Sequence, residues 1–435
     1  MKMVKNLCRL TLLAGCIQAA TVQAGSLADI YQQALQHDPQ LKASAASALA
    51  GAEAIPQAQA DLRPTISLSA NASRNETDSR DFNNSGYTVS LSQPIYDSAA
   101  WYGVKRGEAL SRSAQLAFDQ AQQNLIIRSV ESYLNVLRAK NTLETTQAEE
   151  RAIKRRLDQV NAQFDVGLIP VTDVHEAQAS YDNAKVARIL AEGELDNSFE
   201  AIERLAGQSY NDVDVLSAKY PIENLESNNA NAWLNKARDG NLALQVADSN
   251  VEASRQLTRV NRSGHKPTVS LTASHDQDKG NTLNDDRNET NQIGLTFSLP
   301  LYSGGGTSSR IREAEYRLDE ALQNREDVFQ GIKLDTRSLL RNLSTDVLSV
   351  AARKQSIRSS ETALKATEEG FNVGTRNVVD VLQAEQNLYR AQRDYAEARF
   401  NYVLNLFRFK QVIGTLNPED IQGLDIWMVS GNDQG

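Results

Sequence analysis

The chain has 435 residues and a formal net charge of −9, and 6% of its residues are aromatic. The acidic balance argues against a nucleic-acid partner, and the low aromatic content argues against a thick globular core. Alanine, glutamine, leucine and charged residues are frequent instead, which is typical of long helices and coiled coils.

Residues 1–24 have the features of a secretory signal peptide. A short apolar segment follows a basic start and ends at the small-residue cleavage pattern Val22-Gln23-Ala24. The basic residues are Lys2, Lys5 and Arg9. Cleavage removes three positive charges and no negative ones, so the net charge of −9 becomes −12. No later segment has the ~18–20 consecutive apolar residues of a membrane-spanning helix.

The two cysteines, Cys8 and Cys16, both lie inside this segment. A chain cut after residue 24 therefore has no disulfide and no thiol chemistry. Leu13-Ala14-Gly15-Cys16 also matches a bacterial lipobox, so lipidation of Cys16 is an open alternative.

Residues 25–207 are expected to form one structural repeat. Ser26–Leu62 has a helical pattern with Ser26 as N-cap, and Pro64 ends it. Polar and apolar residues then alternate in two segments, which predicts a β-hairpin that Pro94 closes. Apolar spacing of three and four beyond it predicts a long helical hairpin with a coiled-coil seam. The predicted bounds are 65–93 for the β-hairpin and 98–205 for the helical hairpin.

Residues 230–414 repeat this organisation. The strand sequence after Pro267 resembles the one after Pro64, and Pro300 corresponds to Pro94. The predicted bounds are 268–300 for the second β-hairpin and 306–413 for the second helical hairpin. The segments 208–229 and 415–435 lack long periodic patterns and are expected to fold together beside the repeats.

Each helical hairpin has a glycine turn with nearly the same sequence. The first turn spans Phe164–Val174 and the second spans Phe371–Val381, with Gly167 and Gly374 at the same position. A left-handed glycine is expected there at the helix end. Asp173, followed by Glu176, resembles the start of a capping box for the return helix.

The four predicted strands have the length and alternation of membrane strands, at about 8–10 residues each. Four strands are too few to close a barrel, and an open edge in lipid leaves backbone groups without hydrogen bonds. The fold predicted is therefore mixed α and β, with a twelve-strand barrel shared by three protomers. The polar side chains of the barrel strands are expected to face a water-filled lumen. Tyr96, Trp101, Tyr102 and Tyr302 lie near strand ends, where an aromatic girdle or ordinary helix packing explains them equally well.

These features together resemble the TolC family of outer-membrane channel-tunnel proteins over residues 27–424. The most specific marks are the duplicated Pro-Thr-apolar-Ser-Leu strands, the corners at Pro94 and Pro300, and the two turns. The resemblance implies a homotrimer in the Gram-negative outer membrane, with a helical periplasmic tunnel and an equatorial domain. It implies an exit duct for efflux pumps or type I secretion. The implied partners are outer-membrane lipid, a periplasmic adaptor and an inner-membrane pump of RND, ABC or MFS type.

The resemblance also implies a gate at the periplasmic turns. By position, the gate residues are Thr172, Asp173, Phe371 and Arg376. Asp380 matches an acidic constriction ring, whereas Gln383 replaces a second acidic ring and Phe371 replaces a tyrosine. The residues themselves permit an ion pair between Asp173 and Arg376 on neighbouring turns. The alternatives are that Asp173 only caps its helix and that Asp380 is simply solvated.

No enzyme motif is evident, and no cofactor or metal is expected. The four histidines are scattered, and Gly304-Gly305-Gly306 lacks the lysine of a phosphate-binding loop. The rival hypothesis is a periplasmic coiled-coil adaptor, which would share the export signal and a helical hairpin. An adaptor is expected to carry one hairpin and a compact soluble β-domain.

Overall fold

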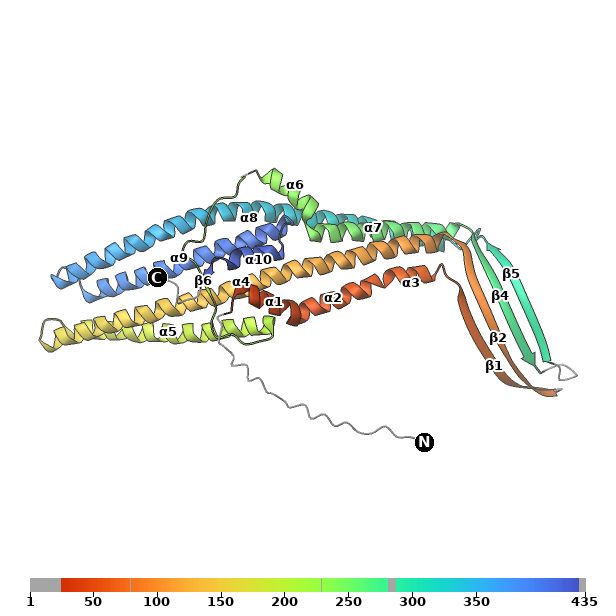
Figure 1. Cartoon of the computed structure of the whole chain (residues 1–435), viewed down its shortest axis with the longest axis horizontal. Helices are drawn as coiled ribbons and strands as arrows, with labels where there is room; N and C mark the ends of the chain where they lie inside the picture. The colour runs from red at the N-terminus through yellow and green to blue at the C-terminus, as the bar shows by residue number, and fades with distance from the viewer. Residues whose placement is uncertain (1–24, 79, 228, 281–286, 430–435) are drawn as a thin grey trace, which may run out of the picture.

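The computed structural model describes residues 25–78, 80–227, 229–280 and 287–429. The predicted signal peptide and Cys16 lie outside the described residues. The chain forms a long helical rod that passes at one end into a β-sheet (Figure 1). Among the described residues, no helix combines the length and the apolarity needed to cross a bilayer.

The first repeat contains three short helices, a β-hairpin and one long helical hairpin. Its elements are α1 (Leu27–His37), α2 (Pro39–Ala52), α3 (Ala54–Ala60), β1 (Thr65–Thr77), β2 (Arg80–Asp97), α4 (Ser98–Asp165) and α5 (Val171–Ala206). The Ser26 hydroxyl accepts a hydrogen bond from the Asp29 N–H at 3.1 Å, which confirms the predicted N-cap. The predicted helix over Ser26–Leu62 is broken, because Asp38 ends α1 and caps α2 ahead of Pro39.

The second repeat has the same order. Its elements are α6 (Ala230–Gly240), α7 (Leu242–Arg262), the 3-10 turn η1 (Ser263–His265), β4 (Thr268–Lys279), β5 (Arg287–Ser298), α8 (Gly306–Asn372) and α9 (Val378–Val412). The 68 residues of α4 and the 67 of α8 correspond to about 100 Å of helix each at 1.5 Å per residue. The long helices agree closely with the predicted helical hairpins, because an uninterrupted apolar period over so many residues has few alternatives.

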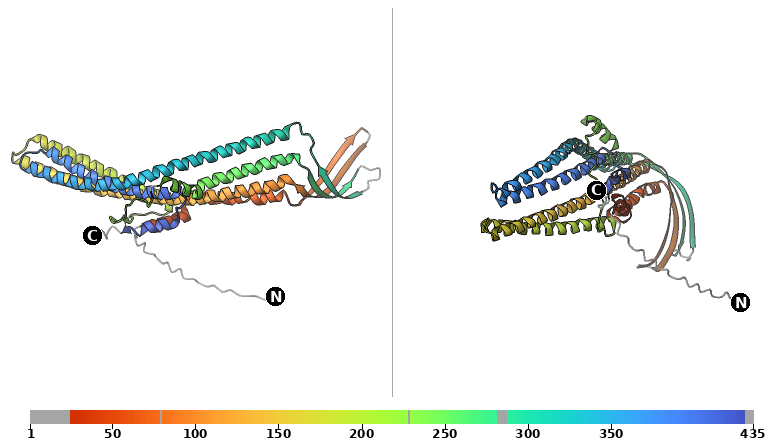
Figure 2. Two further views of the ribbon diagram at one scale, coloured as in Figure 1. Left: turned by 90° about the horizontal axis from the view of Figure 1, so that it is seen from above. Right: turned by 60° about the vertical axis from the view of Figure 1, so that its left-hand side comes forward.

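The four long strands form one antiparallel sheet in the order β1–β2–β4–β5. The sheet curves as a continuation of the rod (Figure 2). Its register places apolar residues opposite one another on one face, for example Leu68 with Val89 and Leu271 with Leu295. This face is exposed: Ile66 and Leu68 are each 72% accessible, and Ile293 is 81% accessible. The opposite face is polar, and there the Ser67 and Ser90 hydroxyls lie 2.7 Å apart.

The strands are longer than predicted, with 13, 18, 12 and 12 residues. Much of the segment expected to be a hydrophilic loop between β1 and β2 continues the ladder instead, because backbone pairing tolerates polar side chains. The prediction that Pro94 ends its strand is also wrong. β2 passes through Pro94 to Asp97, with a bulge between Pro94 and Tyr96 that accommodates the missing N–H. Pro64 and Pro267 lie just before β1 and β4, and Pro300 follows β5.

A hydrophobic core built from several helices and two short strands lies at the middle of the rod. The segments predicted to fold together do so: β3 (Val215–Leu216) pairs with β6 (Met428–Val429), beside α10 (Pro418–Asp425). The tail is therefore partly helical rather than irregular. Tyr133 of α4 is fully buried in this core, and its hydroxyl donates to the Asp214 carbonyl at 2.7 Å. The core joins both repeats because α1, α4, α9 and α10 all contribute to it.

The helices lie in a row whose two edges belong to different repeats. In the half of the rod next to the sheet, α2 and α3 pack on α4, α4 packs on α7, and α7 packs on α8. In the other half, α5 packs on α4, α4 on α9, and α9 on α8. One edge is therefore formed by the first repeat, through β1, α2, α3 and α5. The other edge is formed by β5 and α8 of the second repeat.

Candidate functional site

The two hairpin turns lie together at the end of the rod farthest from the sheet (Figure 1). Gly167 and Gly374 have φ values of 76° and 79°, as predicted for left-handed glycines that end a helix. The Leu168 N–H donates to the Gln163 carbonyl at 2.9 Å, and the Thr375 N–H donates to the Gly370 carbonyl at 2.9 Å. These bonds satisfy helix-end carbonyls and hold both turns in similar shapes.

The turns expose apolar side chains to solvent. Val166 is 69% accessible, Leu168 is 73% accessible and Val373 is 75% accessible. Exposed apolar groups gathered at one end of a molecule are typical of a surface that another protein covers.

The structure places Thr172 and Asp173 in the first turn of α5 but gives them no capping role. The N-cap is Pro170, in an extended conformation and without a side-chain cap bond. The Asp173 N–H donates to the Pro170 carbonyl at 3.1 Å, so the predicted capping box of Asp173 and Glu176 is wrong. The extended Pro170 starts the helix three residues earlier than a cap at Asp173 would, and Asp173 remains a first-turn acid near the positive helix end.

Arg376 and Asp380 lie next to each other on the second turn. An Arg376 guanidinium nitrogen is 3.8 Å from an Asp380 carboxylate oxygen. Asp380 also forms a reciprocal capping box with Asn377, at 2.9 Å and 3.3 Å. Asp380 therefore has a structural role in starting α9, in addition to any role in a constriction. The ion pair between Asp173 and Arg376 was predicted for neighbouring turns, and it stays a prediction.

The residue that most clearly joins the two hairpins was not singled out from the sequence. Arg156 of α4 reaches Glu368 of α8 at 2.5 Å and Glu385 of α9 at 3.3 Å. The Phe371 ring, at the end of α8, lies 5.9 Å from the Arg156 guanidinium carbon. Polar and aromatic contacts from three helices, α4, α8 and α9, thus meet beside the turns. They lie next to an apolar cluster that includes Ile153, Leu157, Val160, Val378 and Leu382.

This ion cluster is buried and only partly satisfied. The side chain of Arg156 is 10% accessible and that of Glu385 is 6% accessible, whereas Glu368 is 39% accessible. Arg156 Nε and Glu385 Oε2 have no hydrogen-bond partner. Burial raises the pKa of the Glu385 carboxyl, even though Arg156 opposes that effect. One guanidinium facing two carboxylates therefore joins the two repeats beside the turns.

Replacing Glu385 with glutamine is expected to remove a pH dependence of stability. Because its pKa is raised in the folded state, the Glu385 carboxyl binds a proton more tightly in the folded than in the unfolded protein. The free energy of unfolding therefore increases as pH falls toward the ordinary glutamate pKa of about 4.3. The melting temperature of the wild type, relative to Glu385→Gln, should therefore rise as pH falls from 8 to 5. Differential scanning calorimetry measures both profiles, and parallel profiles would contradict the assigned burial effect.

The seam between α4 and α9 carries further polar pairs toward the middle of the rod. The pairs are Glu131 with Arg408 at 3.2 Å, Arg138 with Asn401 at 2.7 Å, and Glu149 with Arg393 at 3.0 Å. Together with Arg156 and Glu385 they form an antiparallel ladder, because the numbers rise along α4 as they fall along α9. The contact between the repeats along α4 and α9 therefore combines this polar ladder with the apolar cluster beside the turns.

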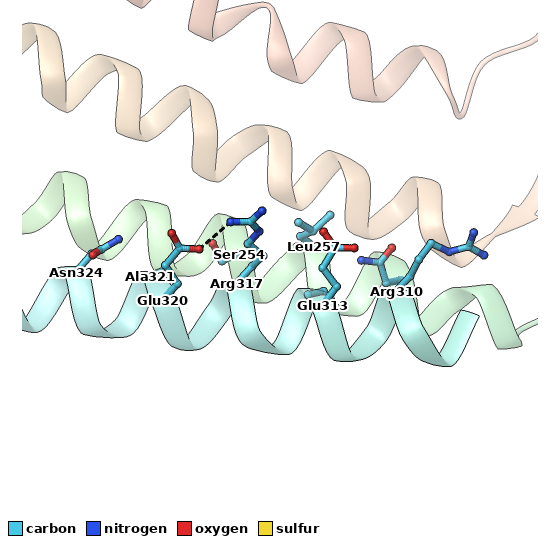
Figure 3. A pocket seen from close by; sticks show the side chains of 10 residues that line it. Ser254, Leu257, Arg310, Glu313, Arg317, Glu320, Ala321 and Asn324 are labelled. Atoms are coloured by element: carbon cyan, nitrogen blue, oxygen red, sulfur yellow. Dashed lines mark hydrogen bonds and ion pairs between the residues drawn. The ribbon is translucent and has the colours of Figure 1, made fainter. Parts of the chain in front are cut away.

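The grooves elsewhere on the helices lack a comparable constellation. One groove of about 460 Å³ lies between α7 and α8, and Figure 3 shows charged side chains of α8 along it. Arg317 and Glu320 form an ion pair there at 3.0 Å. Among the described residues, no group of histidine, cysteine, aspartate and glutamate side chains has the arrangement of a metal site.

The sequence and the structure both match one family of proteins. The family model described as "Outer membrane efflux protein" matches residues 30–208 and 233–415, which is most of both repeats. The chain belongs to this family. It is 34% identical to outer membrane protein TolC of Vibrio cholerae over 416 residues, which cover 94% of each protein. It is 27% identical to the alkaline protease secretion protein AprF of Pseudomonas aeruginosa, over 93% of this chain and 88% of AprF.

A solved structure with the same fold is the outer membrane channel CmeC of Campylobacter jejuni. The TM-score is 0.77 at 16% identity, and the match covers 99% of this chain and 98% of CmeC. The mixed α and β channel-tunnel fold predicted from the sequence is confirmed. The protein is an outer-membrane channel for efflux or secretion in the Gram-negative envelope, and the adaptor hypothesis is wrong. The relatives are channel proteins rather than enzymes.

Proposed function

We propose that three copies of this chain assemble into one gated exit duct. The support is the row of elements with two unlike edges, since joining one edge to the other in a neighbouring copy makes a head-to-tail contact that closes into a ring. β1 and β5 each lack a strand neighbour on one side among the described residues, and pairing them between copies satisfies the edges that lipid cannot. Three copies give twelve strands, with the apolar face toward lipid.

Within each copy, each repeat would form a separate part of the duct. Segments 25–207 and 230–414 would each supply one β-hairpin and one helical hairpin, while 208–229 and 415–435 would form an equatorial collar. The polar face of the sheet suits a water-filled lumen, and a wide polar duct needs no specific contact with its cargo. Selection of cargo would then rest with the partners.

The partners proposed are a periplasmic adaptor and an inner-membrane pump of RND, ABC or MFS type. The exposed apolar side chains at the two turns support a protein partner at the periplasmic end. The similarity to AprF, a protease secretion protein, supports type I secretion as one use, and the efflux family supports another.

The gate proposed at these turns consists of Thr172, Asp173, Phe371 and Arg376, with Asp380 as an acidic ring. Three copies of Asp380 around one axis would repel one another and attract cations. The polar ladder between α4 and α9 supports a reversible opening, because water can replace the partners of its more exposed pairs, such as Glu131 with Arg408. Gly167 and Gly374 would keep the turns compact as the hairpins move.

Substituting Arg376 with serine tests this gate. We expect a higher single-channel conductance in planar bilayers, because the variant loses the cation proposed to pair with Asp173 of a neighbouring turn. An exposed pair contributes only about 0–1 kcal/mol, so the increase should be several-fold at most. The matched control is Lys354→Ser, which removes a cation from the exposed surface of α8. Equal conductance of Arg376→Ser and wild type would contradict the gate.

The trimer is tested separately on the wild-type protein. Purification in detergent is expected to yield a species of three protomers that conducts ions after reconstitution. A monomer without conductance would contradict the duct itself, whatever the result for Arg376.

A further inference from the structure

Three cations surround one aromatic ring where the helices join the sheet. The centroid of the Tyr102 ring lies 5.4 Å from Lys266 Nζ, 5.8 Å from the Arg259 guanidinium carbon and 6.0 Å from Lys105 Nζ. Three different segments supply them, since Lys105 is on α4, Arg259 is on α7 and Lys266 lies between η1 and β4. The arrangement is therefore a product of the fold and not of one basic stretch of sequence.

These cations have no carboxylate partner among the described ion pairs, in contrast to their neighbours. Arg255 is paired with Glu252, and Arg262 is paired with Glu315 at 2.7 Å. Lys266 Nζ donates to the Ser98 hydroxyl at 3.1 Å, and the Arg259 guanidinium approaches the Gln256 side-chain oxygen at 3.5 Å. Three positive charges around one ring repel one another, so an anion placed between them would be bound favourably.

The acidic residues close to these cations have other partners or form no ion pair with them among the described residues. Glu252, near Arg259, accepts from Gln256 and pairs with Arg255. The Asp97 carboxylate caps α4 by accepting from the Ala99 and Ala100 N–H groups, at 2.8 Å and 3.2 Å. Glu108 lines the same groove as Lys105 but forms no ion pair with it among the described residues. The attraction of the tyrosine ring holds the cations in place without neutralising their charge.

The cluster lies beside the lipid-facing side of the sheet. Tyr96 is opposite Val269 in the register, and Val269 is opposite Phe297, so Tyr96 is on the apolar face. The Trp101 ring packs edge-on against Tyr96 at 5.1 Å and is 48% accessible. Trp and Tyr side chains at the end of an apolar band mark the level of the lipid headgroups.

The polar face of the sheet and Lys105 line two different grooves at the junction between helices and sheet. Thr65 and Ser92, from the polar face of the sheet, line a different groove together with Gly103 and Arg106 of α4. Lys105 instead lines a groove with residues of α6 and α7, including Arg238 and Gln256. In Figure 1, α6 protrudes from the side of the rod. Lys105 therefore lies in a groove on the side of the rod from which α6 protrudes, and Thr65 and Ser92 of the polar face do not line that groove.

We propose that Lys105, Arg259 and Lys266 form a binding site for the phosphate of an anionic phospholipid in the periplasmic leaflet of the outer membrane. Lysine and arginine are the usual partners of phosphate, and Trp101 would lie against the adjoining acyl chains. The proposal rests on the outer-membrane placement of the sheet and goes beyond the duct function. A bound lipid would fix the depth at which the sheet meets the bilayer.

Lipid retention by the purified full-length protein tests the site. The protein is delipidated in detergent and then supplied with phosphatidylglycerol or phosphatidylcholine, and bound lipid is measured by native mass spectrometry. We expect the wild type to bind phosphatidylglycerol more tightly than Lys105→Gln/Arg259→Gln/Lys266→Gln, by about 100-fold in dissociation constant, because each cation near a membrane surface contributes ~1 kcal/mol. Binding of the zwitterionic lipid should be equal in both proteins.

Two controls keep the result specific. Arg337→Gln/Arg341→Gln/Lys354→Gln removes the same charge from exposed positions of α8 and should bind phosphatidylglycerol like the wild type. Lys105→Arg/Lys266→Arg keeps the charges and should restore binding. Equal phosphatidylglycerol binding by the wild type and the glutamine triple variant would overturn the site. Inorganic phosphate that competes as strongly as the lipid would overturn the lipid assignment. Conductance, which tests the duct, should be retained in the glutamine triple variant.

Discussion

Arg156→Met is expected to weaken the contact between the two helical hairpins and to raise the conductance of the channel. The substitution keeps the bulk of the side chain but leaves the carboxylate of Glu385 buried without its cation. Removing one partner of a buried ion pair costs about 3–5 kcal/mol, because the remaining charge loses its compensation without gaining water. The variant should therefore melt at a lower temperature, and its closed state should conduct more in planar bilayers.

A second substitution separates the charge effect from a loss of packing. In Arg156→Met/Glu385→Gln no uncompensated charge remains, so we expect most of the lost stability to return. Glu368→Gln alone should have a small effect, because Glu368 is 39% accessible and water can replace its partner. If the double variant were as unstable as Arg156→Met, the buried charge would not be the cause.

Gly414→Ala is expected to destabilise the middle of the rod by several kcal/mol. Gly414 follows the end of α9 with a φ of 74°, and a Cβ there would lie 2.2 Å from the carbonyl group of Gly240, at the end of α6. The left-handed conformation alone costs an L-residue roughly 1–2 kcal/mol. The clash is with backbone, so the α6–α7 junction must move away from α9, and the surrounding core must repack.

Gly374→Ala provides the matched control for this effect. Gly374 has a similar φ of 79°, but an added Cβ would meet no atom within 4 Å. Its substitution should cost only the conformational term, about 1–2 kcal/mol. Thermal unfolding of both variants, followed by circular dichroism, gives the comparison. Equal loss of stability in the two variants would show that the contact between Gly240 and Gly414 is unimportant.

Much of the architecture follows from local patterns that occur in both sequence repeats. The long helices, the glycine turns and the alternation of the strands were predicted correctly, because helical and strand periods depend on neighbouring residues. Strand ends were predicted poorly. β2 continues through Pro94, because a bulge absorbs the proline, and bulges depend on the partner strand.

The candidate site was only partly visible in the sequence. The turns and their glycines were identified, but Arg156 and Glu385 were not, although a glutamate four residues after Val381 interrupts an apolar stripe. Asp173 had the pattern of a capping residue, yet Pro170 starts α5. A local pattern identifies candidates for a cap, and the backbone conformation selects among them.

By itself the sequence determined the two repeats and the two-sided strands, and it predicted that other copies of the chain complete the barrel. Only the tertiary structure decided which charged residues of one repeat meet those of the other, as Arg156 meets Glu385. It likewise brings Lys105 and Arg259 to the same Tyr102 ring. The physical reason is that such meetings depend on the axial register of helices separated by more than a hundred residues. That register is set by packing over the whole contact and not by any one segment.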